Sequence, residues 1–189
     1  MKTRESGMPD DATWEGFFAP EATLRALELT AKCRDVLDMG CGYGTFSVPA
    51  ARICSGTVYA IDIEEEMVAA TRARARAAAV VNIIVAQRDF IQDGSGLSDA
   101  SLDYVMLFNI LHAEEPHVLL HEARRVLSAD GILGVMHWNY DPATPRGPSM
   151  EIRPRPEQIL CWAEEAGFRA VPPSKVDLPP YHYGFAFRL

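Results

Sequence analysis

Residues 35–46 read DVLDMGCGYGTF, and this stretch decides the fold. A short aliphatic run stops at the acid Asp38, three glycines follow at alternate positions, and a helical pattern begins at Phe46. Glycine tolerates positive φ and lets a ligand lie directly against the main chain. We therefore expect a buried parallel strand, a tight glycine turn and a helix N-terminus. This arrangement holds nucleotide-like ligands at the carboxyl ends of strands in doubly wound sheets.

The spacing of the glycines distinguishes between possible ligands. The dinucleotide fingerprint is G-x-G-x-x-G, and Thr45 occupies the place of its third glycine. A carboxylate at Asp38 would repel a pyrophosphate, whereas it suits a cation such as an amino group or a sulfonium. The acid followed by Gly40, Gly42 and Gly44 resembles motif I of the class I S-adenosylmethionine-dependent methyltransferases.

Composition and charge limit the class of protein. The chain has 189 residues, 48% hydrophobic and 23% charged, which is typical of one globular domain with a substantial core. A formal net charge of −8 argues against a nucleic-acid partner and favours a small-molecule substrate. We find neither a membrane-length apolar segment nor the apolar region of a secretory signal. Four scattered cysteines without a C-x-x-C pair predict reduced thiols and a cytoplasmic protein. The sequence gives no indication of the oligomeric state.

Strand and helix patterns alternate along most of the chain. Strands are expected at 35–39, 57–61, 82–86, 102–108 and 131–137, and helices at 46–54, 65–79, 115–127 and 156–166. Such alternation predicts βαβ units and a parallel sheet. Two further strands, 168–171 and 183–189, have no helix between them and should pair antiparallel. We therefore predict an α/β fold in one domain, 1–189. It should be a Rossmann-like, doubly wound, mostly parallel sheet of seven strands that ends in an antiparallel hairpin. The family resemblance extends over roughly residues 20–189 and implies the same fold.

The second expected strand ends at Asp62, 62 − 44 = 18 residues beyond Gly44. A carboxylate there can accept hydrogen bonds from both hydroxyls of a ribose, as in dinucleotide folds. The resemblance implies that the cofactor is S-adenosyl-L-methionine and that the product is S-adenosyl-L-homocysteine. It also implies that Asp89 accepts a hydrogen bond from the adenine amino group. Ile63 would lie against the adenine face, with an ordinary core contact as the alternative.

Three more positions complete the expected cofactor site. Asn109 lies in the motif IV segment, which faces the methionine moiety, and no N/D-P-P-Y/F sequence of the adenine and glutamine methyltransferases occurs there. Phe90 either contacts the adenine ring or packs in the core. Cys41, between the glycines, is expected to be inert packing. The predicted cofactor-binding residues are thus Asp38, Gly40, Cys41, Gly42, Gly44, Asp62, Ile63, Asp89, Phe90 and Asn109.

Catalysis requires few groups, because a methyl sulfonium is already activated and the protein mainly aligns the reactants. A general base is needed only if the nucleophile arrives protonated. His112 and His137 fall at or just past the carboxyl ends of strands, where ligands bind in such sheets, and Tyr140 follows closely. These three are the candidate bases. His117 and His121 are spaced for a metal on a helix, but no third ligand is evident, so we expect no metal site.

A long segment, 138–158, separates the last parallel strand from the last helix. It reads WNYDPATPRGPSMEIRPRPEQ, and loops of this length are often functional. It resembles a segment of small-molecule methyltransferases related to the ubiquinone/menaquinone biosynthesis enzymes. Its arginines, Arg146, Arg153 and Arg155, either bind an anionic substrate group or are solvated charges.

The N-terminal region carries three aromatic residues, Trp14, Phe17 and Phe18. We expect residues 1–12 to be flexible and residues 13–31 to form a helix or lid. The aromatic residues either pack in the core or cover the ligand, since aromatics often line apolar pockets. In the second case they and a substrate-side loop, 138–155, would roof the acceptor.

These features predict a cytoplasmic S-adenosylmethionine-dependent methyltransferase with a small-molecule acceptor. Two alternatives remain at this point. A nucleotide-dependent oxidoreductase is disfavoured by Asp38 and Thr45. A non-catalytic S-adenosylmethionine-binding protein would keep the same cofactor residues.

Overall fold

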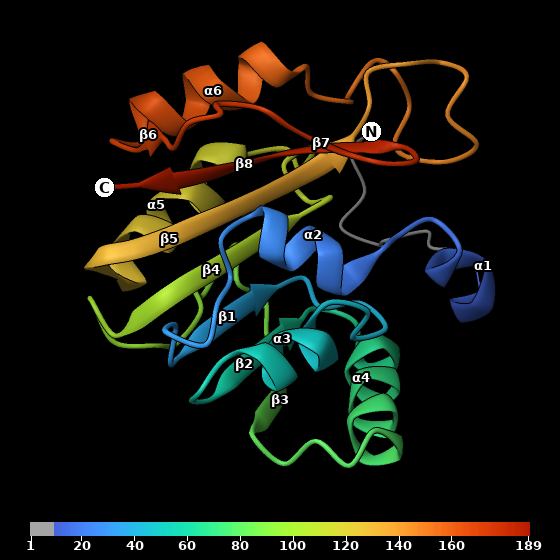
Figure 1. Cartoon of the computed structure of the whole chain (residues 1–189), viewed down its shortest axis with the longest axis vertical. Coiled ribbons are helices and arrows are strands. Elements are labelled where there is room, and N and C mark those ends of the chain that lie inside the picture. The colour runs from blue at the N-terminus through green and yellow to red at the C-terminus, as the bar shows by residue number, and fades with distance from the viewer. Residues whose placement is uncertain (1–9) are drawn as a thin grey trace.

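The central strand, β1 (Val36–Met39), is buried along its whole length, as expected of an aliphatic strand covered on both faces. The computed structural model describes residues 10–189 and places β1 inside an eight-stranded sheet (Figure 1). The strand order is β3-β2-β1-β4-β5-β8-β6, and β7 pairs with β8. The other strands are β2 (Val58–Asp62), β3 (Ile83–Gln87), β4 (Leu102–Phe108), β5 (Leu127–Trp138), β6 (Arg169–Ala170), β7 (Val176–Leu178) and β8 (His182–Arg188).

The direction of the strands matches the prediction. Strands β1 to β5 are mutually parallel, and β8 runs antiparallel to β5. The chain builds β1 to β3 outward on one side and then returns to place β4 on the other side of β1. Such a reversal leaves a crevice at the carboxyl ends of the central strands, which is where ligands bind in open α/β sheets. The mostly parallel Rossmann-like architecture is therefore confirmed.

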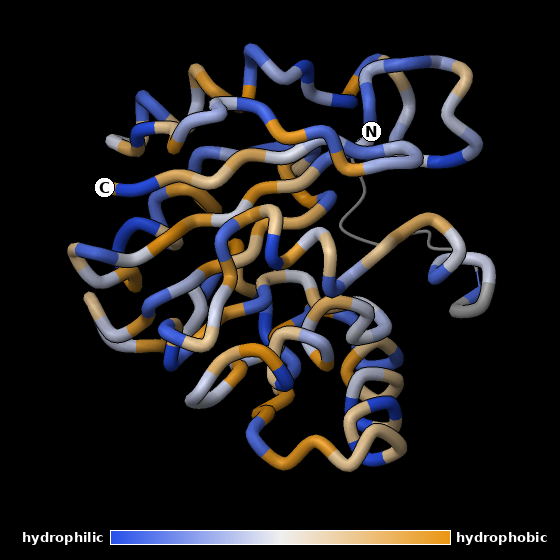
Figure 2. Tube along the Cα trace, viewed as in Figure 1, coloured by the Kyte–Doolittle hydropathy of each residue, from blue (hydrophilic) through white to orange (hydrophobic). Residues whose placement is uncertain are grey.

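Helices cover both faces of the sheet. They are α1 (Asp11–Glu15), α2 (Pro20–Ala26), α3 (Ser47–Ile53), α4 (Glu65–Ala77), α5 (Pro116–Val126) and α6 (Pro156–Glu165). Alternate residues of β1 enter two separate cores. Val36 packs with α2 and α3, whereas Leu37 packs with α5 and α6. Figure 2 shows that apolar residues concentrate along the strands between these helical layers. No helix in residues 10–189 is long and apolar enough to cross a bilayer.

Local sequence explains where several helices begin. Proline occupies the first turn of α2, α5 and α6, where its missing N–H costs nothing. In α4, Glu65 and Glu66 lie in the first turn, and Arg74 and Arg76 lie in the last, so both ends complement the helix dipole.

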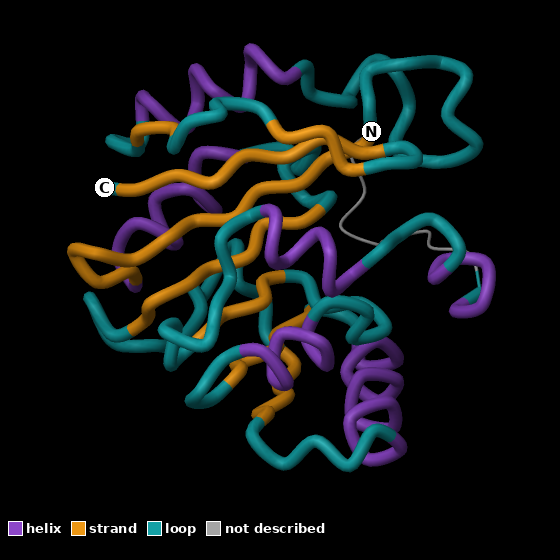
Figure 3. Tube along the Cα trace, viewed as in Figure 1, coloured by secondary structure: helices purple, strands orange, loops and turns teal. Residues whose placement is uncertain are grey.

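Two segments differ from the predicted layout. The sheet has eight strands rather than seven, because β7 forms within the proline-rich segment 172–180 and pairs with β8. The expected N-terminal helix is divided into α1 and α2, because Gly16 ends the first helix and Pro20 begins the second. Of the segment expected to be flexible, residues 1–9 lie outside the described residues. Figure 3 shows the long loop between β5 and α6 that the sequence predicts.

Candidate functional site

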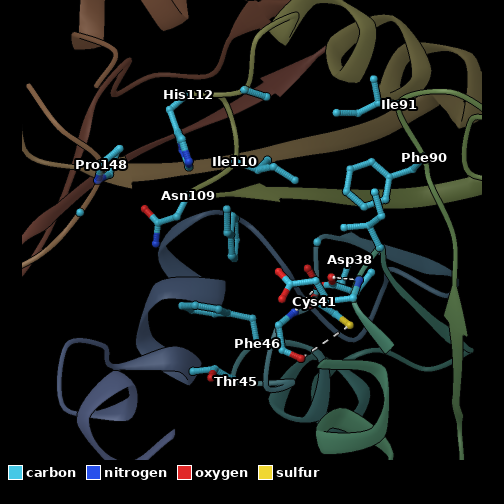
Figure 4. Close-up of a pocket in the computed structure, with 18 of the residues that line it drawn as sticks. Asp38, Cys41, Thr45, Phe46, Phe90, Ile91, Asn109, Ile110, His112 and Pro148 are labelled. Atoms are coloured by element: carbon cyan, nitrogen blue, oxygen red, sulfur yellow. Dashed lines mark hydrogen bonds between the residues drawn. The ribbon is translucent and has the colours of Figure 1, made fainter. Parts of the chain in front are cut away.

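A cavity of about 510 Å³ opens at the carboxyl ends of β1, β2 and β4. This volume lies within the range of small-molecule sites. The cavity brings together residues from every expected cofactor segment of the chain (Figure 4). Those that line it are Asp38, Gly40, Cys41, Gly42, Asp62, Ile63, Asp89, Phe90 and Asn109; Gly44 does not.

The glycine loop needs its glycines for backbone conformation and for space. Gly40, Gly42 and Gly44 have φ values of 82°, 52° and 75°, a region that side chains disfavour. A Cβ atom on Gly40 would lie 2.7 Å from Cδ1 of Ile110, which forms the opposite wall. A Cβ atom on Gly44 would instead meet Thr71 of α4 at 3.0 Å. Gly44 therefore shapes the turn and its packing rather than the cavity surface.

Asp38 supplies a buried carboxyl group at the end of β1. It is 3% exposed, and its Oδ2 accepts a hydrogen bond from the Ser47 hydroxyl at 2.5 Å. Burial raises the pKa of Asp38 to about 7, with the nearby Asp62 contributing in the same direction and Ser47 opposing the rise. A cationic group beside this carboxyl would favour its ionised form. Asp38 therefore suits an ammonium or sulfonium ligand.

Asp62 joins the glycine loop to the end of β2. Its Oδ2 accepts a hydrogen bond from the Gly42 N–H at 2.8 Å, and its Oδ1 accepts one from the Glu64 N–H at 3.0 Å. Burial raises its pKa, and these two N–H donors oppose the rise. Each carboxylate oxygen can accept a further hydrogen bond, so a diol at the cavity wall can bind beside the loop.

The far wall of the cavity is formed after β3 and β4. Asp89 caps a turn, because its Oδ1 accepts hydrogen bonds from the Ile91 and Gln92 N–H groups at 3.2 and 3.1 Å. Phe90 belongs to the buried core and also lines the cavity, so it packs as one alternative expected, and its contact with an adenine ring stays a prediction. Figure 4 shows Phe90 and Ile91 on one side of the cavity and Pro148 on the other, with Ile110 between Phe90 and His112.

Two buried polar atoms of the wall have no hydrogen-bond partner within residues 10–189. They are Oγ1 of Thr45 and Oδ1 of Asn109, and both residues line the cavity. Buried polar atoms in folded proteins are normally paired, so these two indicate a polar ligand. Asn109 also has a φ of 54°, which is uncommon outside glycine and frequent at functional sites. Thr45 is absent from the predicted cofactor residues, where it appears only in place of a third glycine. Its position directly after Gly44, the last glycine of the turn, is the signal for a polar side chain at the cavity.

Aromatic residues close the other end of the cavity. Trp14, Phe46, Phe108 and Trp138 all line it. The ring centroid of Trp14 lies 6.2 Å from that of Trp138, and Phe17 lies 5.4 Å from the same ring. The N-terminal aromatics thus pack against the end of β5, and Trp14 at the same time contributes to the cavity wall.

The three candidate bases have different environments. His112 lines the cavity. His137 is 0% exposed, does not line it, and has its ring centroid 5.6 Å from that of His112. Tyr140 faces a separate depression, where the Arg155 guanidinium lies 4.0 Å from its ring centroid. Of the three, only His112 can touch a ligand in the cavity.

Arg153 organises the loop that follows β5. Its guanidinium is buried and donates hydrogen bonds to the Asn139 carbonyl at 2.9 Å, the Pro148 carbonyl at 2.8 Å and the Thr144 hydroxyl at 2.5 Å. Arg146 is exposed and lines the cavity rim with Pro148. Burial lowers the pKa of Arg153. Arg153 therefore stabilises the loop through its hydrogen bonds, and it is neither a solvated charge nor an anion-binding group.

The described residues contain no cluster of three or more metal-binding side chains. His117 pairs with Glu165 of α6, with Nε2 and Oε2 3.7 Å apart, and its ring lies near Trp162. Its contacts are therefore with a neighbouring helix.

Comparison with known proteins gives a family and a set of related folds. A family described as "Methyltransferase domain" matches residues 36–131, about half of the chain. A structure described as a SAM-dependent methyltransferase from Aquifex aeolicus is 26% identical, with a TM-score of 0.82. The match covers 95% of this chain and 94% of that one. An S-adenosylmethionine-dependent methyltransferase from Mesorhizobium loti shares the fold at 19% identity and a TM-score of 0.69, over 90% of this chain and 98% of that one. A comparison with curated proteins finds no significant match.

Proposed function

The chain belongs to the methyltransferase domain family, and we propose that it transfers a methyl group from S-adenosyl-L-methionine to a small-molecule acceptor. Its cofactor is S-adenosyl-L-methionine, and its product is S-adenosyl-L-homocysteine. The observation that carries the proposal is the pair of buried acids, Asp38 and Asp62, beside a loop whose three glycines all have positive φ.

The residues of the cavity fit the cofactor group by group. Asp38 would accept a hydrogen bond from a cationic amino group, and Asp62 would accept from the two ribose hydroxyls. The unpaired Asn109 Oδ1 and Thr45 Oγ1 give the methionine moiety further partners. Phe90, Ile63 and Asp89 line the cavity. The first two would form an apolar wall for the adenine ring, and Asp89 would accept a hydrogen bond from its amino group. When bound, the cofactor supplies an electrophilic methyl group attached to a positively charged sulfur.

The aromatic end of the cavity supports a small, largely apolar acceptor. Trp14 and Trp138 cover it, and Pro148 of the long loop closes one side. We take residues 13–31 as a lid and 138–155 as a substrate-side loop. The likeness of the segment 138–158 to methyltransferases of ubiquinone/menaquinone biosynthesis supports the same substrate class. A net charge of −8 favours it over a nucleic acid.

For methyl transfer, the protein must hold the acceptor in line with the methyl group and exclude water. His112 is our candidate for the general base, because it is the one predicted base that lines the cavity. We place the reaction in the cytoplasm, since all four cysteines are free thiols and three are buried.

The test is direct. S-adenosyl-L-homocysteine at micromolar concentration should raise the melting temperature, because a ligand that binds only the native state stabilises it. NAD and NADP should not, and stabilisation by NAD alone would contradict the cofactor assignment. Radiolabelled S-adenosyl-L-methionine, incubated with a panel of apolar hydroxyl and amine acceptors, then separates an active enzyme from a protein that only binds the cofactor.

A further inference from the structure

His137 is a buried polar side chain to which the cofactor site assigns no role. Within residues 10–189, neither ring nitrogen has a side-chain hydrogen-bond partner, and the one polar group that favours its charged form is the Trp138 backbone. Native proteins rarely leave such a group in their interior without a reason. The aliphatic residues around it, such as Met136 and Val135 of the same strand, show that the sheet does not require a polar side chain here.

The nearest ring of a cavity residue is that of His112. The two ring centroids are 5.6 Å apart with an interplanar angle of 80°, so the edge of one imidazole faces the other ring. His112 lines the cavity in the stretch after β4, beside Asn109, as Figure 4 shows. His137 belongs to β5 and does not reach the cavity. His112 therefore lies between His137 and the cavity.

The surroundings of His137 keep its ring neutral. Burial lowers its pKa well below the usual range, and His112, His182 and Arg153, which approach it from three other segments, act in the same direction. A neutral imidazole carries one N–H donor and one bare nitrogen acceptor. Burial disfavours a proton on His137, and a charge on His112 would disfavour it further.

We propose, on the basis of the function proposed above, that His137 is a positioning residue for the general base. It orients His112 toward the acceptor and accepts a hydrogen bond from it when His112 becomes protonated. In that step the O–H or N–H bond of the acceptor breaks, its electron pair stays on the acceptor atom, and the proton adds to the cavity-facing ring nitrogen of His112. The other N–H of the resulting imidazolium then points to the bare nitrogen of His137. This is the orienting role that a third group has behind many catalytic bases.

The experiment follows the ring nitrogens by ¹⁵N-edited NMR across pH 5–9, using the full chain saturated with S-adenosyl-L-homocysteine. In His137→Phe, the titration midpoint of His112 should fall by about one pH unit, a tenfold weaker hold on the proton, because a hydrogen bond to the charged form is lost. His137→Gln offers a neutral acceptor oxygen and should restore most of the shift. Signals of His121, which is exposed on α5, should be the same in every variant.

Two outcomes would overturn the proposal. One is an unchanged His112 midpoint in a folded His137→Phe variant that still binds S-adenosyl-L-homocysteine. The other needs no variant: a wild-type spectrum in which His137 takes up a proton before His112 contradicts the assigned order of charging. Failure of S-adenosyl-L-homocysteine to bind the wild-type protein would instead contradict the proposed function.

Discussion

The two ends of the cavity are built in different ways. At the end that we propose for the cofactor, the functional groups lie in the last residues of a strand or shortly after it, and some are joined by short hydrogen bonds such as that from the Gly42 N–H to Asp62. At the acceptor end, the wall comes from α1, the start of α3 and the loop after β5, which are brought together by ring contacts and by Arg153. The first end is a local motif repeated on neighbouring strands. The second exists only through long-range packing, so the two ends should respond separately to substitution.

The largest effect is expected at the glycine loop. Gly40→Val should reduce the affinity for S-adenosyl-L-homocysteine by about 100-fold or more, which corresponds to about 2.7 kcal/mol. Its side chain would collide with Ile110 and would occupy backbone at a φ of 82°. Calorimetric titration gives the affinity, and circular dichroism checks the fold. Gly96→Val is the matched control, because Gly96 has a φ of 76° but lies outside the cavity lining. Comparable loss of affinity in the control would mean that backbone strain alone explains the result.

The buried arginine tests the acceptor end by itself. Arg153→Met should lower the free energy of unfolding by about 2 kcal/mol, since charge-assisted hydrogen bonds to buried carbonyls are lost. The loop 139–148 should become sensitive to protease, whereas the affinity for S-adenosyl-L-homocysteine should stay within about threefold, roughly 0.6 kcal/mol. Chemical denaturation and limited proteolysis measure the two effects. Arg155→Met, which removes an exposed arginine and its contact with Tyr140, should change stability by less than about 1 kcal/mol. Equal effects of the two variants would contradict the role of Arg153 in stabilising the loop.

Substitution of an N-terminal aromatic residue should have a smaller effect, and it should alter both ends of the cavity. Trp14→Ala removes a ring that packs on Trp138 and lines the cavity. We expect S-adenosyl-L-homocysteine to bind about three- to tenfold more weakly, since roughly 1 kcal/mol is typical of one aromatic contact. The fold should remain intact, because Trp14 is only partly buried. Thr13→Ala, one residue away and exposed, is the control for helix α1. Wild-type affinity in Trp14→Ala would show that α1 is not a lid.

The last comparison concerns a proton linkage at Asp38, whose effect on binding is a fraction of a proton. The pKa of Asp38 in the ligand-free protein, about 7, lies above the ordinary value of 3.8. Between these two pH values the native state therefore binds more protons than the unfolded state. Stability should therefore fall as pH rises from about 4 to 7, and Asp38→Asn should flatten that slope. A cationic ligand group should favour the ionised carboxylate. Binding of S-adenosyl-L-homocysteine near pH 6.5 should then release a fraction of a proton, measurable by calorimetry in buffers of different ionisation enthalpy. Proton uptake would contradict a cation beside Asp38.

Much of the fold could be predicted because it depends on local rules. A buried aliphatic run, a glycine turn and an amphipathic helix each leave a pattern within about ten residues, and this located β1 to β5 and α3 to α6 closely. β7 could not be predicted, because its three residues lie between prolines and form a strand only through antiparallel pairing with β8. The division of the N-terminal helix has a local signal, because Gly16 ends α1 and Pro20 begins α2.

The sequence by itself determined the end of the cavity that we propose for the cofactor. Motif spacing fixes backbone conformation, and conformation places Asp38, Asp62 and Asn109 at one edge of the sheet. Only the tertiary structure decided which histidine reaches the cavity, because His112 and His137 both follow the strand pattern and differ in what packs around them. It likewise turned Arg153 inward and left Arg146 at the rim. Burial and orientation of a side chain depend on neighbours far away in the chain, and no local pattern records them.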